Sequence, residues 1–296
     1  MATVAVVGLG AMGRRVAARL LAAGNDVVVW NRDRSKADEL VDEGAVEAET
    51  PADAARRADA VITMVTDPAA LQAVTEGDEG VVRGVDRRTT VIQMSTVGPA
   101  AVERLASLLP DESLLDAPVL GSLSEVESGT LNVFVGGPQA LVERWRPLLS
   151  QLGSVLHVGD VGAGSAAKLV ANTTLIGVIG VLGEALALAQ GLGLPREAAF
   201  RVLGVTALGE QAARRRPAVE SGDYPPRFSL ALARKDADLI LAAAAASERD
   251  LRLTKAAREW LVDAERDGWG AADYSAVLAR MLEPTTDESQ PASSSR

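Results

Sequence analysis

Short apolar runs rich in β-branched residues alternate with stretches of helical periodicity over residues 3–159, and this alternation limits the fold more than any other feature. The runs are TVAVVG (3–8), DVVVW (26–30), AVITMV (60–65), TTVIQMS (89–95) and SLLDAPV (113–119). The helix-period stretches between them cover residues 11–23, 34–43, 51–57 and 98–108. Two further runs, LNVFVGG (131–137) and VLHVG (155–159), extend the same sheet. Apolar strands that alternate with helices predict a doubly wound α/β sheet.

The strand pattern stops after residue 162, and the rest of the chain has the pattern of helices separated by glycine and proline. We expect helices over residues 165–191, 196–203, 208–220, 229–246, 251–266 and 271–282. The sequence therefore predicts an α/β Rossmann-type domain over residues 1–161, followed by an all-α domain over residues 162–282. Residues 283–296 are polar and rich in serine, with nothing to bury, so we expect this tail to be disordered.

The acidic composition excludes several kinds of partner. With a formal net charge of −10, the chain would be repelled by nucleic acid and by anionic membranes. It has no cysteine and one histidine, His157, so we expect no disulfide and no metal site. The amino end runs into its first strand without a basic leader, and the apolar run between Lys168 and Glu184 is shorter than the roughly 20 residues that span a bilayer. We therefore expect a cytoplasmic protein in which this run is a buried helix.

A G-x-G-x-x-G motif follows the first strand and opens the first helix, in the segment VAVVGLGAMGRRV. Glycines at this spacing permit a tight turn and let a pyrophosphate approach the backbone amides at the helix start. The motif alone is weak, and a merely structural glycine turn is the alternative. The strand before it and the helix after it predict a dinucleotide site made by Gly8, Leu9, Gly10, Ala11, Met12 and Gly13.

The end of the second strand indicates which dinucleotide binds. NAD-binding folds usually have a carboxylate there for the ribose hydroxyls, whereas this chain has Asn31 and Arg32. A guanidinium can hold a 2′-phosphate through two hydrogen bonds. We therefore predict NADP(H) in preference to NAD(H), with Asn31 and Arg32 as cofactor contacts. The carboxylate of Asp33, one residue later, is evidence against this prediction. The alternative for Arg32 is a surface charge exposed to solvent.

Two polar residues, Lys168 and Asn172, lie near the start of the most apolar predicted helix, in GAGSAAKLVANTTL. Because residues i and i+4 share one helical face, the ammonium and the amide can converge on one substrate. A positive charge beside a developing alkoxide stabilises the transition state. The alternatives are a lysine that extends along the surface to solvent, and an asparagine that cross-links helices.

Several motifs follow one another along the chain: GLGAMG, WNRDRSK, MVTDPAAL, MSTVGP, DAPVLGS with GTLNVFVGG, GAGSAAKLVANTTL, FSLALARKDADL and GWGAADYSAV. In this order they resemble the motifs of the β-hydroxyacid dehydrogenases, whose relatives include semialdehyde reductases and, further off, imine reductases. The resemblance spans residues 3–282.

The resemblance assigns a role to each matching residue. It implies that Lys168 protonates the carbonyl oxygen as hydride arrives and that Asn172 is its partner. Lys235 matches a lysine at the active-site cleft, and Asp236 is its neighbour, although ordinary helical charge pairing is the alternative for both. The resemblance implies cofactor contacts at Val65, Thr66, Thr96 and Lys235, and substrate contacts at Ser95, Leu120, Gly121, Ser122 and Asp236.

Departures from the family pattern leave the substrate open. The family typically reads DAPVSGG where this chain has DAPVLGS, so Leu120 stands where a serine contacts the substrate carboxylate. The backbone amides of Gly121 and Ser122 remain able to bind an anion. The cations of ARRRP, residues 213–217, favour a surface charge run over a substrate clamp.

We therefore predict an NADP(H)-dependent oxidoreductase that acts on a small hydroxy acid or carbonyl compound, with Lys168 as general acid/base. An imine reductase that reduces C=N bonds is the first alternative, and a non-catalytic cofactor-binding regulatory protein is the second. The long helix is apolar around most of its circumference, so we expect it to contribute to a homodimer.

Overall fold

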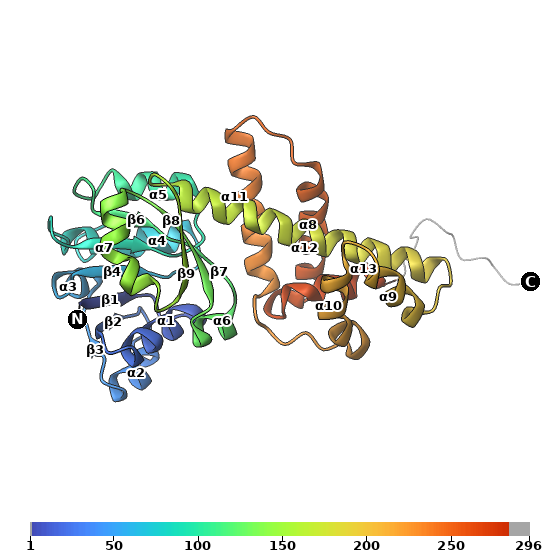
Figure 1. Cartoon of the computed structure of the whole chain (residues 1–296), viewed down its shortest axis with the longest axis horizontal. Helices are drawn as coiled ribbons and strands as arrows, with labels where there is room; N and C mark the ends of the chain where they lie inside the picture. Colours follow the sequence, from blue (N-terminus) through green and yellow to red (C-terminus); the bar gives the residue numbers. More distant parts are fainter. Residues whose placement is uncertain (1, 284–296) are drawn as a thin grey trace, which may run out of the picture. The chain divides into compact units, whose positions relative to one another are not determined.

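The structure is a computed structural model that describes residues 2–283. It divides into two compact units (Figure 1). The first comprises the chain up to Thr173 together with Lys235–Leu251, and the second comprises Thr174–Arg234 together with the residues from Arg252 onward. This division falls at Thr173, within the long helix, whereas the domain boundary predicted from the sequence is residue 162; that boundary stays a prediction. The predicted disordered tail lies, from residue 284 on, outside the described residues.

The sheet of the first unit is built as the alternating pattern predicts. Its strands are β1 Thr3–Val7, β2 Asp26–Trp30, β3 Val46–Glu47, β4 Ala60–Thr63, β5 Thr90–Gln93, β6 Leu114–Asp116, β7 Val119–Leu120, β8 Leu131–Gly136 and β9 Gly153–Gly159. Their order is β3-β2-β1-β4-β5-β6-β8-β7, and β9 pairs with β8. All strand pairs from β3 to β6 are parallel, so the carboxyl ends of these strands lie at one edge of the sheet: β1, β2, β4, β5 and β6.

Helices cover both faces of this sheet, which confirms the doubly wound architecture. They are α1 Ala11–Ala22, α2 Asp38–Asp42, α3 Pro51–Arg56, α4 Pro68–Thr75, α5 Pro99–Ala106, α6 Leu123–Ser128 and α7 Gln139–Leu149, with 3₁₀ turns η1 Arg34–Ala37 and η2 Val81–Arg83. Alternate side chains of one strand enter different cores because they point to opposite faces. Val4 and Val6 pack in the core that includes Leu20 of α1, whereas Ala5 and Val7 pack in the core that includes Leu71 of α4.

The structure departs from the predicted strands at one end of the sheet. The run 113–119 is two strands, because Pro118, which lies between β6 and β7, has no N–H to donate to the ladder with β8. The strand β8 is antiparallel to both of these strands, so the sheet is mixed there. The short elements β3 and α6 have too few residues to show a period, and the sequence did not predict them.

The second unit is helical, as predicted. Its helices are the continuation of α8 Ala163–Gly191, α9 Arg196–Gly204, α10 Gly209–Ser221, α12 Arg252–Arg266 and α13 Val277–Leu282, while α11 Leu230–Ala246 starts in this unit and runs into the first. One prediction is wrong in part: residues 271–282 do not form one helix. They contain the turn η4 Tyr274–Ala276, because the Asp273 carboxylate accepts the Ser275 N–H at 3.1 Å and its hydroxyl at 2.6 Å and so starts a new turn.

Helix α8 begins two residues before the predicted range of 165–191 and ends where predicted. It has 29 residues, so by length and composition it could cross a bilayer. Half of its most apolar 18-residue window is nevertheless buried within the protein, as in the core helix of a folded domain. Length alone therefore does not separate a buried helix from a membrane-spanning one.

Candidate functional site

Glycine occupies the three motif positions for three different structural reasons. Gly8 has φ +101°, and a Cβ there would lie 2.4 Å from the Met64 carbonyl oxygen. A Cβ on Gly13 would lie 2.0 Å from the carbonyl oxygen of Gly8, so this glycine lets α1 pack against the loop. A Cβ on Gly10 would meet no atom within 4 Å, and this residue is the N-cap of α1, where no side chain caps the amides. Gly10 therefore leaves the helix start open to an anion such as a phosphate.

The other residues of the motif offer mainly their backbone. Leu9 is 2% exposed and belongs to the core, and Met12 packs against that core. Ala11 is exposed at the first position of α1. A ligand at this loop would therefore meet amide groups and not side chains.

The loop after β2 presents one cation. Asn31 is used internally, because its Oδ1 accepts the Leu9 N–H at 2.9 Å and its Nδ2 donates to the Asp33 carbonyl at 2.8 Å. The Asp33 carboxylate accepts the Ser35 hydroxyl at 2.8 Å. Arg32 is exposed, and no ion pair or hydrogen bond of its guanidinium is found within residues 2–283. Asn31 thus holds the loop together and leaves Arg32 available for a ligand.

The loops after β4 and β5 are joined through Ser95, which is 1% exposed. Its hydroxyl accepts the Val65 N–H at 2.8 Å and donates to the Thr63 carbonyl at 3.2 Å. The amide of Gln93 holds the same residue, since it accepts the Ser95 N–H at 2.5 Å and donates to the Ser95 carbonyl at 2.9 Å. The hydroxyl of Ser95 is therefore engaged with backbone, and its predicted contact with substrate stays a prediction.

Lys235 of α11 joins the same two loops from the other side. Its Nζ donates to the Thr66 carbonyl at 2.9 Å and to the Thr96 carbonyl at 2.8 Å. The same atom lies 2.8 Å from Oδ1 of Asp236. The Lys235 ammonium thus makes two hydrogen bonds to backbone and one ion pair, while Oδ1 of Asp236 accepts no hydrogen bond within the described residues. Lys235 therefore holds the predicted cofactor loops, and Val65, Thr66 and Thr96 lie together at the edge of the sheet.

Lys168, Asn172 and Asp236 form a buried polar group; they are 9%, 2% and 1% exposed. The Asn172 amide donates to Oδ2 of Asp236 at 2.6 Å. Burial lowers the pKa of Lys168 from 10.5 to about 8; Asp236 opposes this shift and Lys235 adds to it. Burial also raises the pKa of Asp236, against the charges of Lys235 and Lys168. A lysine with a pKa near 8 can give or take a proton near neutral pH.

Asp116 lies at the end of β6 and was not predicted as a site residue. Its carboxylate accepts the Ser165 N–H at 2.6 Å and the Ser165 hydroxyl at 2.8 Å, so it caps the first turn of α8. Burial raises the pKa of Asp116 from 3.8 to about 6, although these hydrogen bonds oppose the shift. The sequence does not indicate this role, because Asp116 and Ser165 are far apart in the chain.

In the turn after β7, the hydrogen-bond donors are bound by a carboxylate of the same segment, that of Glu125. Glu125 accepts the Ser122 N–H at 2.9 Å, the Ser122 hydroxyl at 2.5 Å and the Ser124 hydroxyl at 2.9 Å. The Ser122 hydroxyl, against the opposing effect of burial, holds the pKa of Glu125 at about 2, so this carboxylate is charged at neutral pH. Leu120 is half-buried in β7, and Gly121 has φ +142°. The Ser122 amide that we predicted for a substrate anion is therefore already used, as is the Ser122 hydroxyl.

The predicted charge run at residues 213–217 is only partly a surface feature. Arg215 is 7% exposed, and its guanidinium donates to the Tyr274 hydroxyl and stacks 4.8 Å from the centre of that ring. Arg216 pairs with Glu220 at 2.7 Å, as a surface cation would. The surface prediction is wrong for Arg215, which is a core residue of the second unit.

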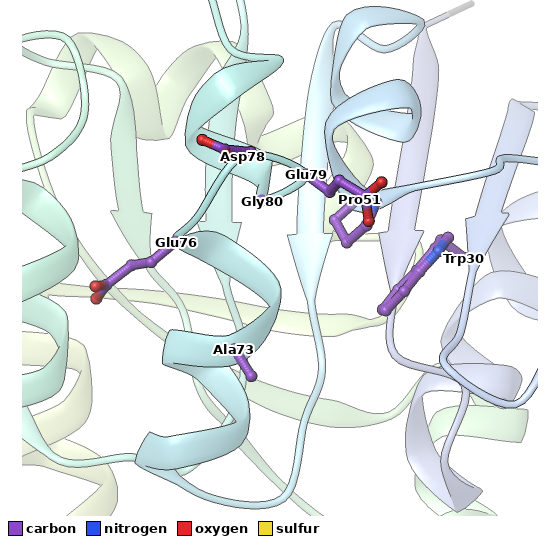
Figure 2. Close-up of a pocket in the computed structure, with 7 residues that line it drawn as sticks. All are labelled: Trp30, Pro51, Ala73, Glu76, Asp78, Glu79 and Gly80. Carbon is purple, nitrogen blue, oxygen red and sulfur yellow. The ribbon is translucent and has the colours of Figure 1, made fainter.

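A cavity of about 310 Å³ lies beside the end of β2 and contains none of the predicted site residues (Figure 2). It is lined by Trp30, Pro51, Ala73, Glu76, Asp78, Glu79 and Gly80. Figure 2 shows the ring of Trp30 near Pro51, with the carboxylates of Glu76 and Asp78 turned away from both. Glu76 already pairs with Arg104 at 2.7 Å. An acidic cavity of this kind is not suited to the phosphates of a dinucleotide.

Two family models match adjoining parts of the chain. Residues 3–162 match the NAD binding domain of 6-phosphogluconate dehydrogenase. Residues 162–281 match the domain described as NAD-binding of NADP-dependent 3-hydroxyisobutyrate dehydrogenase. Together they cover nearly all the described residues, so an NAD(P)-binding domain is established for this chain.

Named proteins match over similar lengths. The 3-sulfolactaldehyde reductase of Escherichia coli (strain K12) is 34% identical over 286 residues, which are 95% of this chain and 96% of the relative. The structure of Mycobacterium tuberculosis 3-hydroxyisobutyrate dehydrogenase with L-serine has a TM-score of 0.85 at 28% identity and covers 96% of this chain and 100% of its own. An imine reductase from Myxococcus stipitatus in complex with NADP⁺ has a TM-score of 0.63 at 25% identity, with 95% and 100% covered.

Proposed function

Because this chain belongs to the β-hydroxyacid dehydrogenase family and is an NAD(P)-dependent oxidoreductase, we propose that it moves hydride between NADP(H) and a small carbonyl or hydroxy compound, with Lys168 as general acid/base. One observation carries this proposal: a lysine that is 9% exposed has a pKa near 8, one helical turn from a buried asparagine. Structural lysines rarely lie buried, since burying an ammonium is costly.

The cofactor would lie along the edge where the parallel strands end, as ligands do in doubly wound sheets. Gly10 leaves open space at the start of α1 for the pyrophosphate. Val65, Thr66 and Thr96 lie on the two loops that Lys235 joins, so these loops are fixed before a ligand arrives. When bound, the nicotinamide supplies or accepts the hydride.

Lys168 would supply the proton. In the direction of reduction, its ammonium protonates the carbonyl oxygen as negative charge develops there. Burial favours the neutral amine that remains, so the protein promotes this proton transfer. Asn172 gives one of its two amide protons to Asp236, and the other is available to orient the substrate oxygen.

The preference for NADP(H) over NAD(H) rests on Arg32. Its guanidinium has no partner within the described residues and follows β2, where the ribose of a dinucleotide lies. A 2′-phosphate would give it a charge-assisted partner. The neighbouring carboxylate, that of Asp33, is engaged by a hydrogen bond from the Ser35 hydroxyl.

For the substrate we propose a small aldehyde acid or keto acid, on the pattern of the 3-sulfolactaldehyde reductase. The occupied donors of Ser122 imply a weaker hold on a carboxylate than a free amide would give. Imine reduction is the second candidate, and Leu120 in place of a serine is what favours it. The higher TM-score with the hydroxyisobutyrate enzyme, 0.85 against 0.63, supports the first candidate.

We further propose that the enzyme is a cytoplasmic homodimer that uses α8. Val170, Val181 and Leu188 are 67%, 40% and 64% exposed, and their spacing places them along one side of the helix. Exposed aliphatic residues in such a row are typical of a surface covered by a partner. Light scattering should give twice the chain mass of 30.7 kDa, and Leu188→Asp should reduce it to the single mass.

The experiment that tests the proposed function follows the oxidation of NADPH and of NADH with 3-sulfolactaldehyde, succinic semialdehyde, glyoxylate and a cyclic imine. We expect turnover of at least one aldehyde acid with NADPH, and loss of this turnover in Lys168→Ala. Lys255→Ala removes an exposed lysine of the second unit and serves as the matched control. Turnover of Lys168→Ala at the wild-type rate would contradict the proposed mechanism.

A further inference from the structure

A chain of buried hydrogen bonds connects the cofactor loops to the start of the catalytic helix. Gln93 holds Ser95 through two hydrogen bonds, and Ser95 holds Val65. Gln93 also faces Asp116 in the ladder between β5 and β6, where its carbonyl accepts the Ala117 N–H at 2.7 Å. Asp116 in turn accepts two hydrogen bonds from Ser165 of α8. The loops after β4 and β5 are thus connected through β6 to the first turn of the helix.

A second set of contacts closes this chain into a ring. Three positions after Ser165 comes Lys168, and one turn later Asn172 donates to Asp236. The neighbour of Asp236, Lys235, returns to the same two loops through its bonds to the carbonyls of Thr66 and Thr96. Lys168 therefore lies on a segment of α8 that is held at both ends, by Asp116 before it and by Asp236 after it.

The fit around Asp116 leaves no room for this helix end to move inward. A Cβ on Gly164 would lie 2.1 Å from the Asp116 carbonyl oxygen and 2.7 Å from that of Phe134. A Cβ on Gly136 would lie 2.4 Å from the Asp160 carbonyl oxygen. Backbone therefore touches backbone where α8 starts, and Asp116 is 0% exposed beneath it. The remaining freedom is outward motion or rotation, which the two bonds to Ser165 oppose.

We propose that Asp116 is a positioning residue for the reaction: through Ser165 it fixes the height and rotation of the first turn of α8, and so the place of the Lys168 ammonium relative to the cofactor loops. This inference rests on the proposed role of Lys168. A buried carboxylate is costly to retain, and a neutral cap would serve a helix start as well for stability alone. Asp116 differs from a cap with a single contact because its two oxygens hold both the N–H and the hydroxyl of one residue, which fixes orientation as well as distance.

The test compares Asp116→Ala with Asp116→Asn in the full-length protein. Alanine removes both acceptors. Asparagine keeps an oxygen for the Ser165 N–H, and its amide can donate to the Ser165 hydroxyl, which is able to accept. We expect alanine to lower kcat at least tenfold while the Kd for NADPH, measured by calorimetry, changes less than threefold. Asparagine should restore kcat to within threefold of wild type, and the exposed Asp111→Ala should leave both quantities unchanged.

Two measurements distinguish positioning from general damage. Hydrogen exchange at the Ser165 amide should quicken in Asp116→Ala and return toward wild type in Asp116→Asn. In the pH profile of kcat, the loss of rate near pH 8 should move upward in Asp116→Ala, because a displaced Lys168 gains water. If Asp116→Ala does not fold, Ser165→Ala removes one of the two bonds and should lower kcat twofold to fivefold with the same upward movement.

The outcomes separate this inference from the proposed function. Wild-type kcat and an unmoved pH profile in Asp116→Ala, with Lys168→Met inactive, would overturn the positioning role alone. Equal losses of kcat and NADPH binding in both Asp116 variants would also overturn it, since they indicate a general structural role. A Lys168→Met variant that turns over at the wild-type rate would instead contradict the proposed function.

Discussion

Replacing Lys168 by methionine should make the protein more stable while it lowers turnover to a small residual rate. The side chain is 9% exposed, and burial lowers its pKa from 10.5 to about 8. The pKa is lower in the folded chain than in the unfolded chain, so between these values the folded state binds fewer protons. Stability therefore increases as the pH rises from 8 to 10.5. Below pH 8 the buried charge destabilises the fold to its full extent.

The magnitude follows from the size of the shift. A fall from 10.5 to about 8 corresponds to roughly 3 kcal/mol at about 1.4 kcal/mol per pKa unit. This figure already includes the attraction of Asp236, which opposes the shift. Methionine has a similar length and no charge, so at pH 7 it should recover most of this energy. Asp236 keeps Lys235 and Asn172 as partners and is not left alone.

The assay is denaturant unfolding of wild type and Lys168→Met at several pH values. We expect a gain of about 3 kcal/mol at pH 7, or roughly 5 °C in melting temperature, that shrinks toward zero as the pH rises through 8 to 10.5. Lys36→Met, which removes an exposed lysine, should show no such gain. A variant less stable than wild type at pH 7, or a gain independent of pH, would refute the reasoning.

Four further substitutions test other parts of the site. Arg32→Ala should raise the KM for NADPH by about 10- to 100-fold, since a hydrogen bond to a charged group contributes about 1.5–3 kcal/mol, and should leave the KM for NADH nearly unchanged. Gly10→Ala should weaken cofactor binding without lowering the melting temperature, whereas Gly13→Ala should lower both, because only its Cβ would strike backbone, at 2.0 Å. Glu125→Ala should release the two donors of Ser122 and lower the KM for an aldehyde acid severalfold, and it should cost about 1 kcal/mol through the lost cap.

Each of these expectations has a result that contradicts it. Equal changes in KM for the two dinucleotides would mean that Arg32 does not recognise the 2′-phosphate. Unchanged cofactor binding in Gly10→Ala would mean that the pyrophosphate does not approach this residue. An unchanged or higher KM in Glu125→Ala would place the substrate anion away from Ser122.

Much of the fold could be predicted because it depends on local pattern. Successive residues of β1, such as Val4 and Ala5, belong to different cores. A doubly wound sheet is the architecture in which both faces of a strand are buried in this way. The break at Pro118 was visible in the sequence as a residue without an N–H, but the direction of β8 depends on tertiary pairing and has no local pattern. The same limit applies to Arg215, whose burial depends on Tyr274, far away in sequence.

The site was predictable only where it follows a motif. The glycine spacing predicted the open helix start at Gly10, and the i,i+4 spacing predicted that Lys168 and Asn172 share a face. Asp116 was missed because its partner, Ser165, is distant in sequence and an aspartate after a strand is common. The occupied donors of Ser122 were missed because the Glu125 carboxylate turns back onto its own helix start, which sequence alone does not reveal.

The most direct test of the central claim is the pH dependence of kcat in both directions with NADPH or NADP⁺ and one good substrate. If Lys168 is the acid in reduction and the base in oxidation, the rate of reduction should fall as the pH rises through about 8, while the rate of oxidation should increase over the same range. Both dependences should be absent from the residual rate of Lys168→Met. Profiles that are flat from pH 6 to 10, or a dependence that persists in Lys168→Met, would contradict the account.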